Sequence, residues 1–105
     1  MKTPRQKQLE EYLEEDASDP FLHYALALEM LNNHQTSDGI SKLKWVLNQF
    51  PDYLATYYQL GKCLEAENEP EAAATVYSEG MKLATRQQNQ QAFRELKSAL
   101  EEITG

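Results

Sequence analysis

The amino-acid sequence contains two consecutive copies of one pattern, and this repeat constrains the fold more than any other feature. Residues 20–50 align with residues 54–84, and most hydrophobic or small positions fall on positions of the same kind. The aligned pairs are Leu26 with Leu60, Ala27 with Gly61, Met30 with Leu64, Gly39 with Ala73, Leu43 with Tyr77 and, as the exception, Val46 with Gly80. A repeat of this period is typical of stacked helical hairpins. Because such a unit cannot bury its apolar face alone, the units are expected to stack.

The composition favours helices over strands. The 105 residues include 14 Leu and 11 Ala but only two Val and two Ile. Leucine and alanine are good helix formers, whereas β-branched residues favour strands. A chain of this length corresponds to one domain with a modest core. We therefore predict an all-α fold and a single domain over residues 1–105.

The spacing of apolar residues, prolines and capping residues predicts six helices. Thr3 and Asp19 are expected as N-caps, because each is followed by a proline that suits the first helical turn. Thr36 or Ser37 is expected to cap the third helix. The expected helices span about 4–15, 20–32, 37–49, 53–66, 70–86 and 89–103.

The aligned residues also resemble the tetratricopeptide repeat. That repeat has a bulky residue, Leu-Gly and a large residue on its first helix, then Ala, an aromatic and a small residue on its second, and a closing Pro. The second copy carries Tyr57, Leu60, Gly61, Leu64, Ala73, Tyr77 and Gly80. The first copy carries His23, Leu26, Ala27, Met30, Gly39, Leu43 and Val46, and Pro51 closes it. The chain departs from the pattern with His23 for Trp, Val46 at a small position, and Thr85 for Pro.

The resemblance implies an α-solenoid of antiparallel helix hairpins, wound as a right-handed superhelix. Its parts would be a half-repeat helix at 4–16, a first repeat at 20–50, a second repeat at 54–86 and a capping helix at 89–103. The half-repeat is supported because the shift that relates the two copies also places Leu9 on Leu43. The cap is supported because the last helix has one apolar and one polar face, as the end of a solenoid requires. The apolar stripe is Phe93, Leu96, Leu100 and Ile103, opposite Glu95, Ser98, Glu101 and Glu102.

Charge and hydropathy argue against several classes of partner. The net charge is −7 and no cluster of Lys and Arg is present, so no nucleic acid is expected as a partner. No apolar run approaches the roughly 20 residues that cross a bilayer, so no membrane is expected either. Cys63 is the only cysteine, and the first residues lack the apolar core of a secretory signal. These observations favour a cytoplasmic protein.

No group of residues indicates catalysis or metal binding. A nucleophile needs a neighbouring base and a group that orients the base. Cys63 and His23 fall on packing positions of the repeat, where a buried thiol and a buried, hydrogen-bonded imidazole are the simpler interpretations. His34 lies several helical turns beyond His23, too far for joint metal ligation on one helix. We expect a non-enzymatic protein with no cofactor and no metal.

The expected helix at 20–32 is apolar nearly all round, which indicates either burial on every side or an exposed surface with a function. In the resembled family, the first helix of each repeat lines a concave surface where peptides dock. Carried over by position, the resemblance implies one groove. Its residues would be Phe21, Tyr24, Leu28, Leu31, Tyr58, Lys62 and Glu65.

We therefore expect an interaction module whose groove binds a peptide or protein segment through apolar anchors. Lys62 could meet a carboxylate on that segment. Because Lys62 stands alone, the subclass of the family that grips a C-terminal carboxylate with several polar side chains is disfavoured. The alternative function is self-assembly as a homodimer through the same apolar surface. Phe21 could instead pack on the opening helix, and Trp45 could pack there, anchor a partner or contact a second copy.

Overall fold

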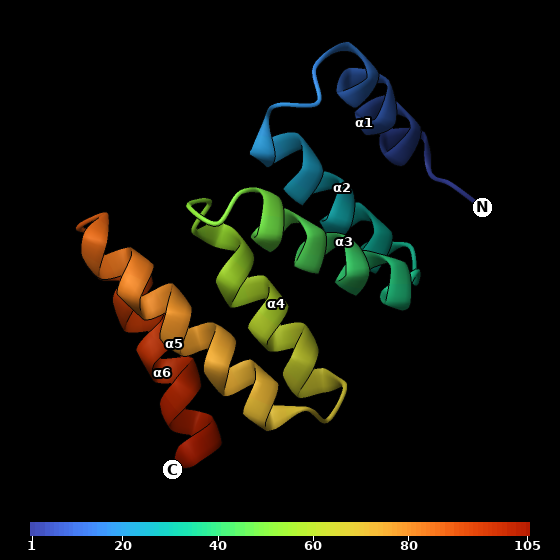
Figure 1. The fold of residues 1–105 in the computed structure, drawn as a ribbon. Coiled ribbons are helices and arrows are strands. Elements are labelled where there is room, and N and C mark those ends of the chain that lie inside the picture. The colour runs from blue at the N-terminus through green and yellow to red at the C-terminus, as the bar shows by residue number, and fades with distance from the viewer. The chain divides into compact units, whose positions relative to one another are not determined.

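The computed structural model describes residues 1–105 and contains six helices and no strand. The helices are α1 (Pro4–Glu15), α2 (Pro20–Asn32), α3 (Thr36–Gln49), α4 (Ala55–Ala66), α5 (Pro70–Arg86) and α6 (Gln90–Thr104). Helices that follow one another pack as the pairs α1 with α2, α2 with α3, α4 with α5 and α5 with α6, and Figure 1 shows the short turns that join them. The prediction of an all-α chain folded as sequential helix hairpins is confirmed. None of the six helices combines the length and apolar character that crossing a membrane would need.

The chain divides into two compact units. Unit 1 is Met1–Tyr53 and holds α1, α2 and α3, and unit 2 is Leu54–Gly105 and holds α4, α5 and α6. Each unit has its own buried residues and its own hairpins. That residues 1–105 form a single domain stays a prediction.

The starts of the helices follow the capping residues in part. Thr3 accepts a hydrogen bond from the Gln6 amide at 3.0 Å, and Asp19 caps α2 in the same way, so both predicted N-caps are confirmed. The prediction for α3 is wrong, because Thr36 is already helical and Gln35 occupies the cap without a side-chain hydrogen bond. Helix α3 thus begins one residue earlier than expected.

Helices α2, α4 and α5 end in the same backbone conformation. His34, Asn68 and Gln88 have φ values of 61°, 61° and 56°, in the left-handed region that usually favours glycine. In each case the next amide donates back to the carbonyl five residues earlier, which closes a Schellman motif and satisfies a terminal carbonyl. These bonds run from Gln35 to Met30, from Glu69 to Leu64 and from Asn89 to Ala84, each at 2.9 Å.

The core of unit 1 lies between α1, α2 and α3. Leu9 of α1 packs with Ala25 and Leu26 of α2, and Leu43 on α3 is fully buried. Gly39 lets α3 approach α2 closely, because a Cβ at this position would lie 2.7 Å from the Leu31 side chain. The small residue of the repeat is therefore a requirement of helix packing.

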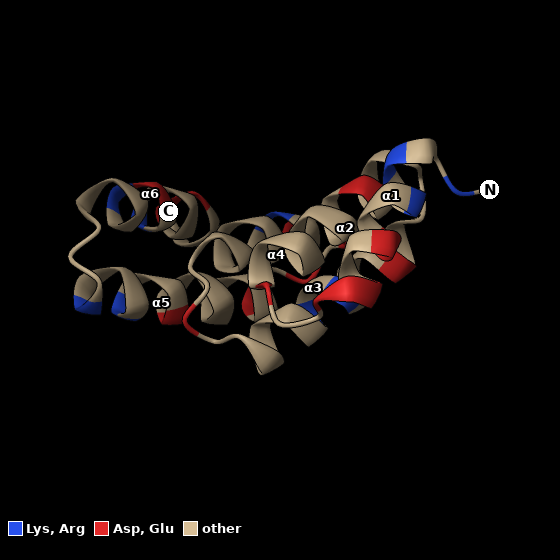
Figure 2. Ribbon diagram, turned by 90° about the horizontal axis from the view of Figure 1, so that it is seen from above, with Lys and Arg blue, Asp and Glu red and all other residues tan.

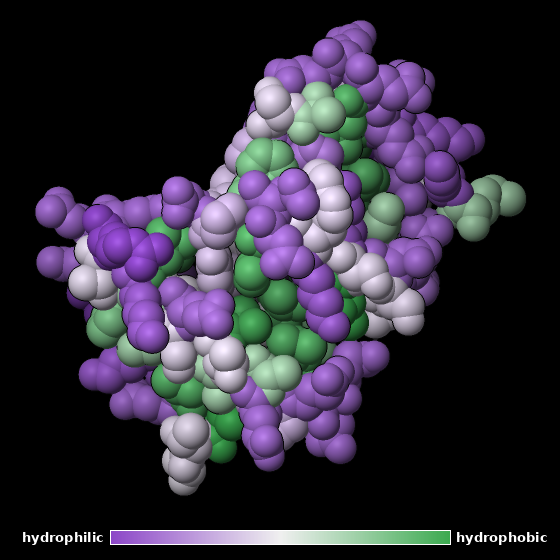
Figure 3. Space-filling view, in the orientation of Figure 1, coloured by the Kyte–Doolittle hydropathy of each residue, from purple (hydrophilic) through white to green (hydrophobic).

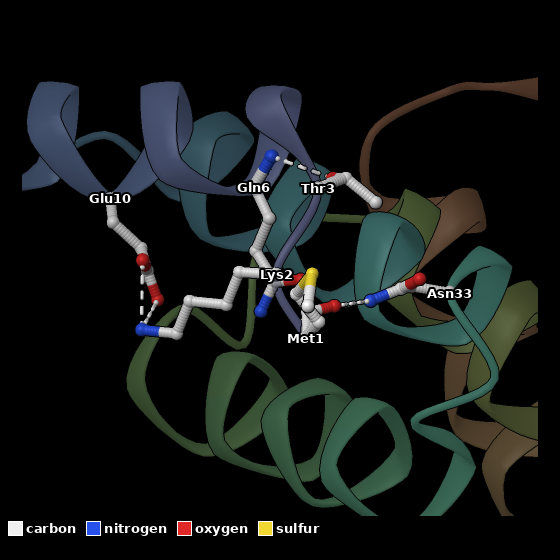
Figure 4. A network of polar contacts seen from close by, with 6 residues as sticks. All are labelled: Met1, Lys2, Thr3, Gln6, Glu10 and Asn33. Atoms are coloured by element: carbon white, nitrogen blue, oxygen red, sulfur yellow. Dashed lines mark hydrogen bonds and ion pairs between the residues drawn. The ribbon is translucent and has the colours of Figure 1, made fainter.

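Polar contacts also fix the three residues that precede α1. The Asn33 side-chain amide donates to the Met1 carbonyl at 2.6 Å. The Lys2 ammonium pairs with the Glu10 carboxylate at 2.9 Å, and both contacts are drawn in Figure 4. The Thr3 hydroxyl donates to the Glu29 carboxylate of α2 at 2.8 Å. These contacts hold the first residues of the chain against α1 and against the last turns of α2.

The core of unit 2 is built around one tyrosine. Tyr77 of α5 is fully buried, and its ring lies directly over Gly61 of α4, where a Cβ atom would collide with it. Gly80 of α5 is similarly tight, because its Cβ would lie 2.8 Å from Tyr57 and 3.0 Å from Leu96 of α6. Gly80 therefore lies where α4 and α6 both pack against α5.

The apolar pattern of α4, the first helix of the second repeat, occurs again in α6. The offset between α4 and α6 is two residues longer than the offset between the two repeats. In this shifted register Leu60 corresponds to Leu96, and both are 2% exposed. The pairs Tyr57 with Phe93 and Leu64 with Leu100 match in the same register. Helix α6 thus has the register of a first helix.

Candidate functional site

The predicted groove residues of unit 1 lie on α2 and differ in exposure. Phe21 is 52% exposed, whereas Tyr24, Leu28 and Leu31 are half-buried. The Tyr24 ring lies 5.5 Å from the Tyr53 ring. Leu31 also packs on α3 at Gly39, so part of it belongs to the hairpin contact. We call these four α2 residues the α2 surface, and Phe21 is its most exposed member.

The exposure of Phe21 bears on whether this side chain packs against α1 or faces the surface. Its neighbour Leu22 packs against the core of Leu9, Ala25 and Leu26 between α1 and α2. Phe21 keeps about half of its surface exposed instead of joining that core. An exposed aromatic side chain on a helix is available for contact with another molecule.

The predicted groove residues of unit 2 lie on α4 and contact one another. The Lys62 ammonium nitrogen lies 3.7 Å from a Glu65 carboxylate oxygen and 5.9 Å from the centre of the Tyr58 ring. The buried Tyr77 hydroxyl donates a short hydrogen bond to Glu65. Burial, followed by this bond and the charge of Glu65, raises the pKa of Tyr77 above its ordinary value. Glu65 is thereby held in place by the core of unit 2.

Two of these residues, Tyr58 and Lys62, line a hollow of about 340 Å³ between α4 and α6. We call it the α4–α6 hollow. Its lining residues are Tyr58, Lys62, Arg94, Glu95, Ser98, Ala99 and Glu102. Glu65 is close to Lys62 but does not line it. The hollow therefore combines an aromatic ring, two cations and two carboxylates in one small concave surface.

The α6 residues of this hollow were not among the predicted site residues. Arg94 takes the place of Tyr58, and Ser98 takes the place of Lys62, when α6 is aligned on α4 in the shifted register. The shift follows α5, which has 17 residues where α3 has 14. A search at the fixed period of the two repeats misses this register. Arg94 also borders a larger hollow of about 580 Å³ at the turn between α5 and α6.

His23 occupies the buried position that the repeat predicts. Its side chain is 5% exposed. The Nε2–H group donates to the Ala17 carbonyl at 2.7 Å, and Nδ1 accepts from the Lys42 ammonium at 3.0 Å. This assignment follows from the partners, since a carbonyl can only accept and an ammonium can only donate. The expectation of a buried, hydrogen-bonded imidazole is confirmed.

Trp45 packs within the α2–α3 hairpin and keeps 40% of its surface exposed. Its ring lies 4.6 Å from the His23 ring and 6.1 Å from the Phe50 ring, measured between centres. The Lys42 ammonium lies 4.0 Å from the centre of the Trp45 ring, a cation–π contact. Burial in this aromatic setting lowers the pKa of Lys42 from its ordinary value.

Cys63 is the only cysteine, and its surroundings affect its reactivity. Cys63 is half-buried on α4, and no group of three His, Cys, Asp or Glu side chains is placed to hold a metal ion. Burial raises the pKa of the Cys63 thiol above its ordinary value, and the Glu67 carboxylate raises it further. A raised pKa leaves less thiolate, which is the reactive form of cysteine.

We therefore expect iodoacetamide to alkylate Cys63 several-fold more slowly in the folded protein than in urea. The rates can be compared at about pH 8, where an ordinary thiol is partly ionised. Glu67→Gln removes the neighbouring charge and should accelerate alkylation of the folded protein, with little effect in urea. Faster alkylation of the folded wild type than of the unfolded chain would contradict this prediction.

Comparisons with known proteins agree with this geometry. The chain is similar to a tetratricopeptide repeat domain protein from Salinibacter ruber, at 33% sequence identity and a TM-score of 0.80 to its crystal structure. That match covers 83% of this chain and 98% of the other. The solution structure of a tetratricopeptide repeat domain protein from the same organism gives the same identity and TM-score over 84% of this chain and 89% of the other.

More distant structures share the fold alone. A protein from Bordetella parapertussis has 22% identity and a TM-score of 0.80, and the match covers 99% of this chain and 90% of the other. MamA has 14% identity and a TM-score of 0.65, over 94% of this chain and 64% of the other. No family model and no curated protein sequence matches the chain.

Proposed function

Because this chain belongs to the tetratricopeptide repeat family, whose domains are generally protein-interaction modules, we propose that it binds a peptide or protein segment without catalysing a reaction. The α4–α6 hollow carries this proposal. It is concave, lies on the first-helix side of unit 2, and brings an aromatic anchor next to two cations.

Tyr58 supplies the apolar anchor. Its ring lies 6.3 Å from the ring of the fully buried Tyr77, so one side of it rests on the core of unit 2. A tyrosine that is already held in place loses little conformational freedom when a ligand packs on it. Such rigid aromatic side chains are enriched among the residues that contribute most to binding.

Lys62 and Arg94 are the two groups of the hollow that could bind an acidic residue of a ligand. Both side chains are exposed, and Lys62 is paired only at 3.7 Å with Glu65. A carboxylate on the ligand would be attracted to both cations, and an arginine can grip it through two parallel hydrogen bonds. Glu95 and Glu102 would accept hydrogen bonds from the ligand backbone or from a basic residue. We propose a segment with an apolar residue beside an acidic one.

The test starts with affinity purification from the native cells and mass spectrometry, followed by binding measurements with the purified partner. We expect Tyr58→Ala combined with Lys62→Ala to raise the dissociation constant at least tenfold, because both the anchor and a cation are lost. Tyr12→Ala is the matched control, since Tyr12 is a 46% exposed tyrosine on α1. It should bind like the wild type.

A second variant, at an exposed position, distinguishes the loss of a binding contact from the loss of the fold. Arg94→Glu changes an exposed side chain of α6 and should also weaken binding while the helical circular dichroism signal is unchanged. Unchanged affinity in both variants, or an equal loss in the Tyr12→Ala control, would show that the partner does not use the α4–α6 hollow. Phe21→Ala in the same assay shows whether the α2 surface also contacts the partner.

The second candidate function is a homodimer, and the exposure of Phe21 is the observation that favours it. In that arrangement the α2 surface would contact a second copy instead of a different protein. Light scattering over a dilution series separates the two ideas, because a mass that stays monomeric at high concentration excludes the dimer.

A further inference from the structure

Helices α1 and α6 carry long cationic side chains where α2, α3, α4 and α5 carry glycine or alanine. We call the small residues at which the two helices of a hairpin pack against each other the crossing positions. They are Ala27 and Gly39 in the α2–α3 hairpin, and Gly61 and Ala73 in the α4–α5 hairpin. Each hairpin thus combines one alanine with one glycine. By the period that relates the two repeats, the counterpart of Gly39 in α1 is Arg5. By the shifted register of α6, the counterpart of Gly61 in that helix is Lys97.

The crossing positions have little room for larger side chains. At Gly39, a Cβ would lie 2.7 Å from the Leu31 side chain and 3.2 Å from the Ala27 carbonyl oxygen. At Gly61, a Cβ would collide with the Tyr77 ring. An arginine or lysine at such a crossing forces the helices apart or must bury its charge, and both cost free energy.

Helices α6 and α1 have the registers of the first and the second helix of a hairpin. Helix α6 has the register of a first helix, and beside it Met81, Phe93 and Leu100 line an open hollow of about 280 Å³. Helix α1 has the register of a second helix: Leu9 is buried like Leu43, and Tyr12 is 46% exposed. Helix α6 of one copy and α1 of another could therefore complete a hairpin. Repeated contacts of this head-to-tail kind build open chains or rings.

We propose that Arg5 and Lys97 are gatekeepers that prevent this end-to-end pairing of two copies. In the completed hairpin, Lys97 would replace Ala27 and Arg5 would replace Gly39, so the two cations would meet at the crossing. The proposed block rests on these two side chains, and it does not depend on the function proposed above.

Both cations lie on open surface, and Lys97 is exposed on α6. Arg5 exposes 59% of its side chain, and its Nε atom lies 4.0 Å from Glu29. Figure 2 shows charges of both signs on α1, and in Figure 3 hydrophilic residues cover its outer side. In the completed hairpin Glu101 would replace Leu31 and face Arg5, so an attraction would also arise. The block therefore comes from bulk and from the cost of burying the cations rather than from repulsion alone.

The test is a double variant, Arg5→Gly and Lys97→Ala in one chain. It gives α1 and α6 the residues that the first repeat has at its crossing positions. Glycine in the first turn of α1 and alanine within α6 are both compatible with a helix. We expect sedimentation and light scattering to show self-association at least tenfold tighter than that of the wild type. The control pair Arg5→Lys and Lys97→Arg keeps bulk and charge, so it should behave like the wild type.

The route of association is checked by crosslinking a mixture of ¹⁵N-labelled and unlabelled double variant. Crosslinks between α1 of one copy and α6 of another are expected. The proposal is overturned if the double variant keeps its helical signal but associates no more tightly than the wild type. It is also overturned if the wild type already pairs through α1 and α6, or if the variant associates through other helices.

Discussion

Replacing Tyr77 by alanine should destabilise the protein by about 3–5 kcal/mol, the usual cost of removing a large buried aromatic side chain. The Tyr77 side chain is completely buried, its ring covers Gly61 and supports Tyr58, and its hydroxyl donates to Glu65. Domains of this size have about 5–15 kcal/mol of stability, so the variant would keep little of it. Urea denaturation followed by circular dichroism measures the loss.

Two further variants show how much the ring and the hydroxyl of Tyr77 each contribute to the free energy of unfolding. Tyr77→Phe keeps the ring and should cost only about 1–3 kcal/mol for the lost hydrogen bond to a charged group. Tyr12→Ala, on the exposed side of α1, should change stability by less than about 0.5 kcal/mol. A loss for Tyr77→Ala no larger than that of Tyr12→Ala would mean that unit 2 is not packed around this residue.

The phenol also makes stability depend on alkaline pH. Burial and the bond to Glu65 raise the pKa of Tyr77 in the folded state, whereas in the unfolded chain it titrates near about 10. Above that pH the unfolded chain loses this proton and the folded chain keeps it, so stability falls as the pH rises. The fall from about pH 9 to pH 11 should be smaller in Tyr77→Phe than in the wild type.

Gly61→Ala should have opposite effects in two backgrounds. In the wild type, the added Cβ collides with the Tyr77 ring, and overpacking of this kind costs about 1–3 kcal/mol. This cost exceeds the gain of about 1 kcal/mol that alanine has over glycine within a helix. In the Tyr77→Ala background the ring is absent, so the same change should be stabilising.

A double-mutant cycle of unfolding free energies measures this reversal directly. Residues in contact show coupling energies of about 0.5–3 kcal/mol, whereas distant residues add independently. The four proteins needed are the wild type, the two single variants and the double variant. An effect of Gly61→Ala that has the same sign and size in both backgrounds would show that the ring and the glycine do not touch.

The secondary structure was predictable because local signals and the repeat agree. Prolines and capping residues mark the starts of α1 and α2, and the apolar spacing marks their length. The same period placed His23 in the core although histidine is an unusual residue there. Before α3 the capping residues Thr36 and Ser37 were misleading, because Gln35 occupies the cap, and the predicted boundary was wrong by a residue.

The candidate site was less predictable. Its residues come from α4 and α6, and the offset between these two helices differs from the period of the repeats. Tyr58 and Lys62 follow from the repeat, but Arg94 enters the α4–α6 hollow through the shift in register after α5. Trp45 is a second case. Its contact with His23 depends on how α3 packs on α2, which no spacing within α3 reveals.

The position of Trp45 has a practical consequence for experiments on unfolding. Trp45 is the only tryptophan in the chain and lies in unit 1, while the only cysteine, Cys63, lies in unit 2. Indole emission therefore monitors one half of the molecule, and a fluorophore attached to the thiol monitors the other. Coincident denaturation curves from these two probes would mean that both halves melt as one cooperative block, and separate midpoints would reveal two.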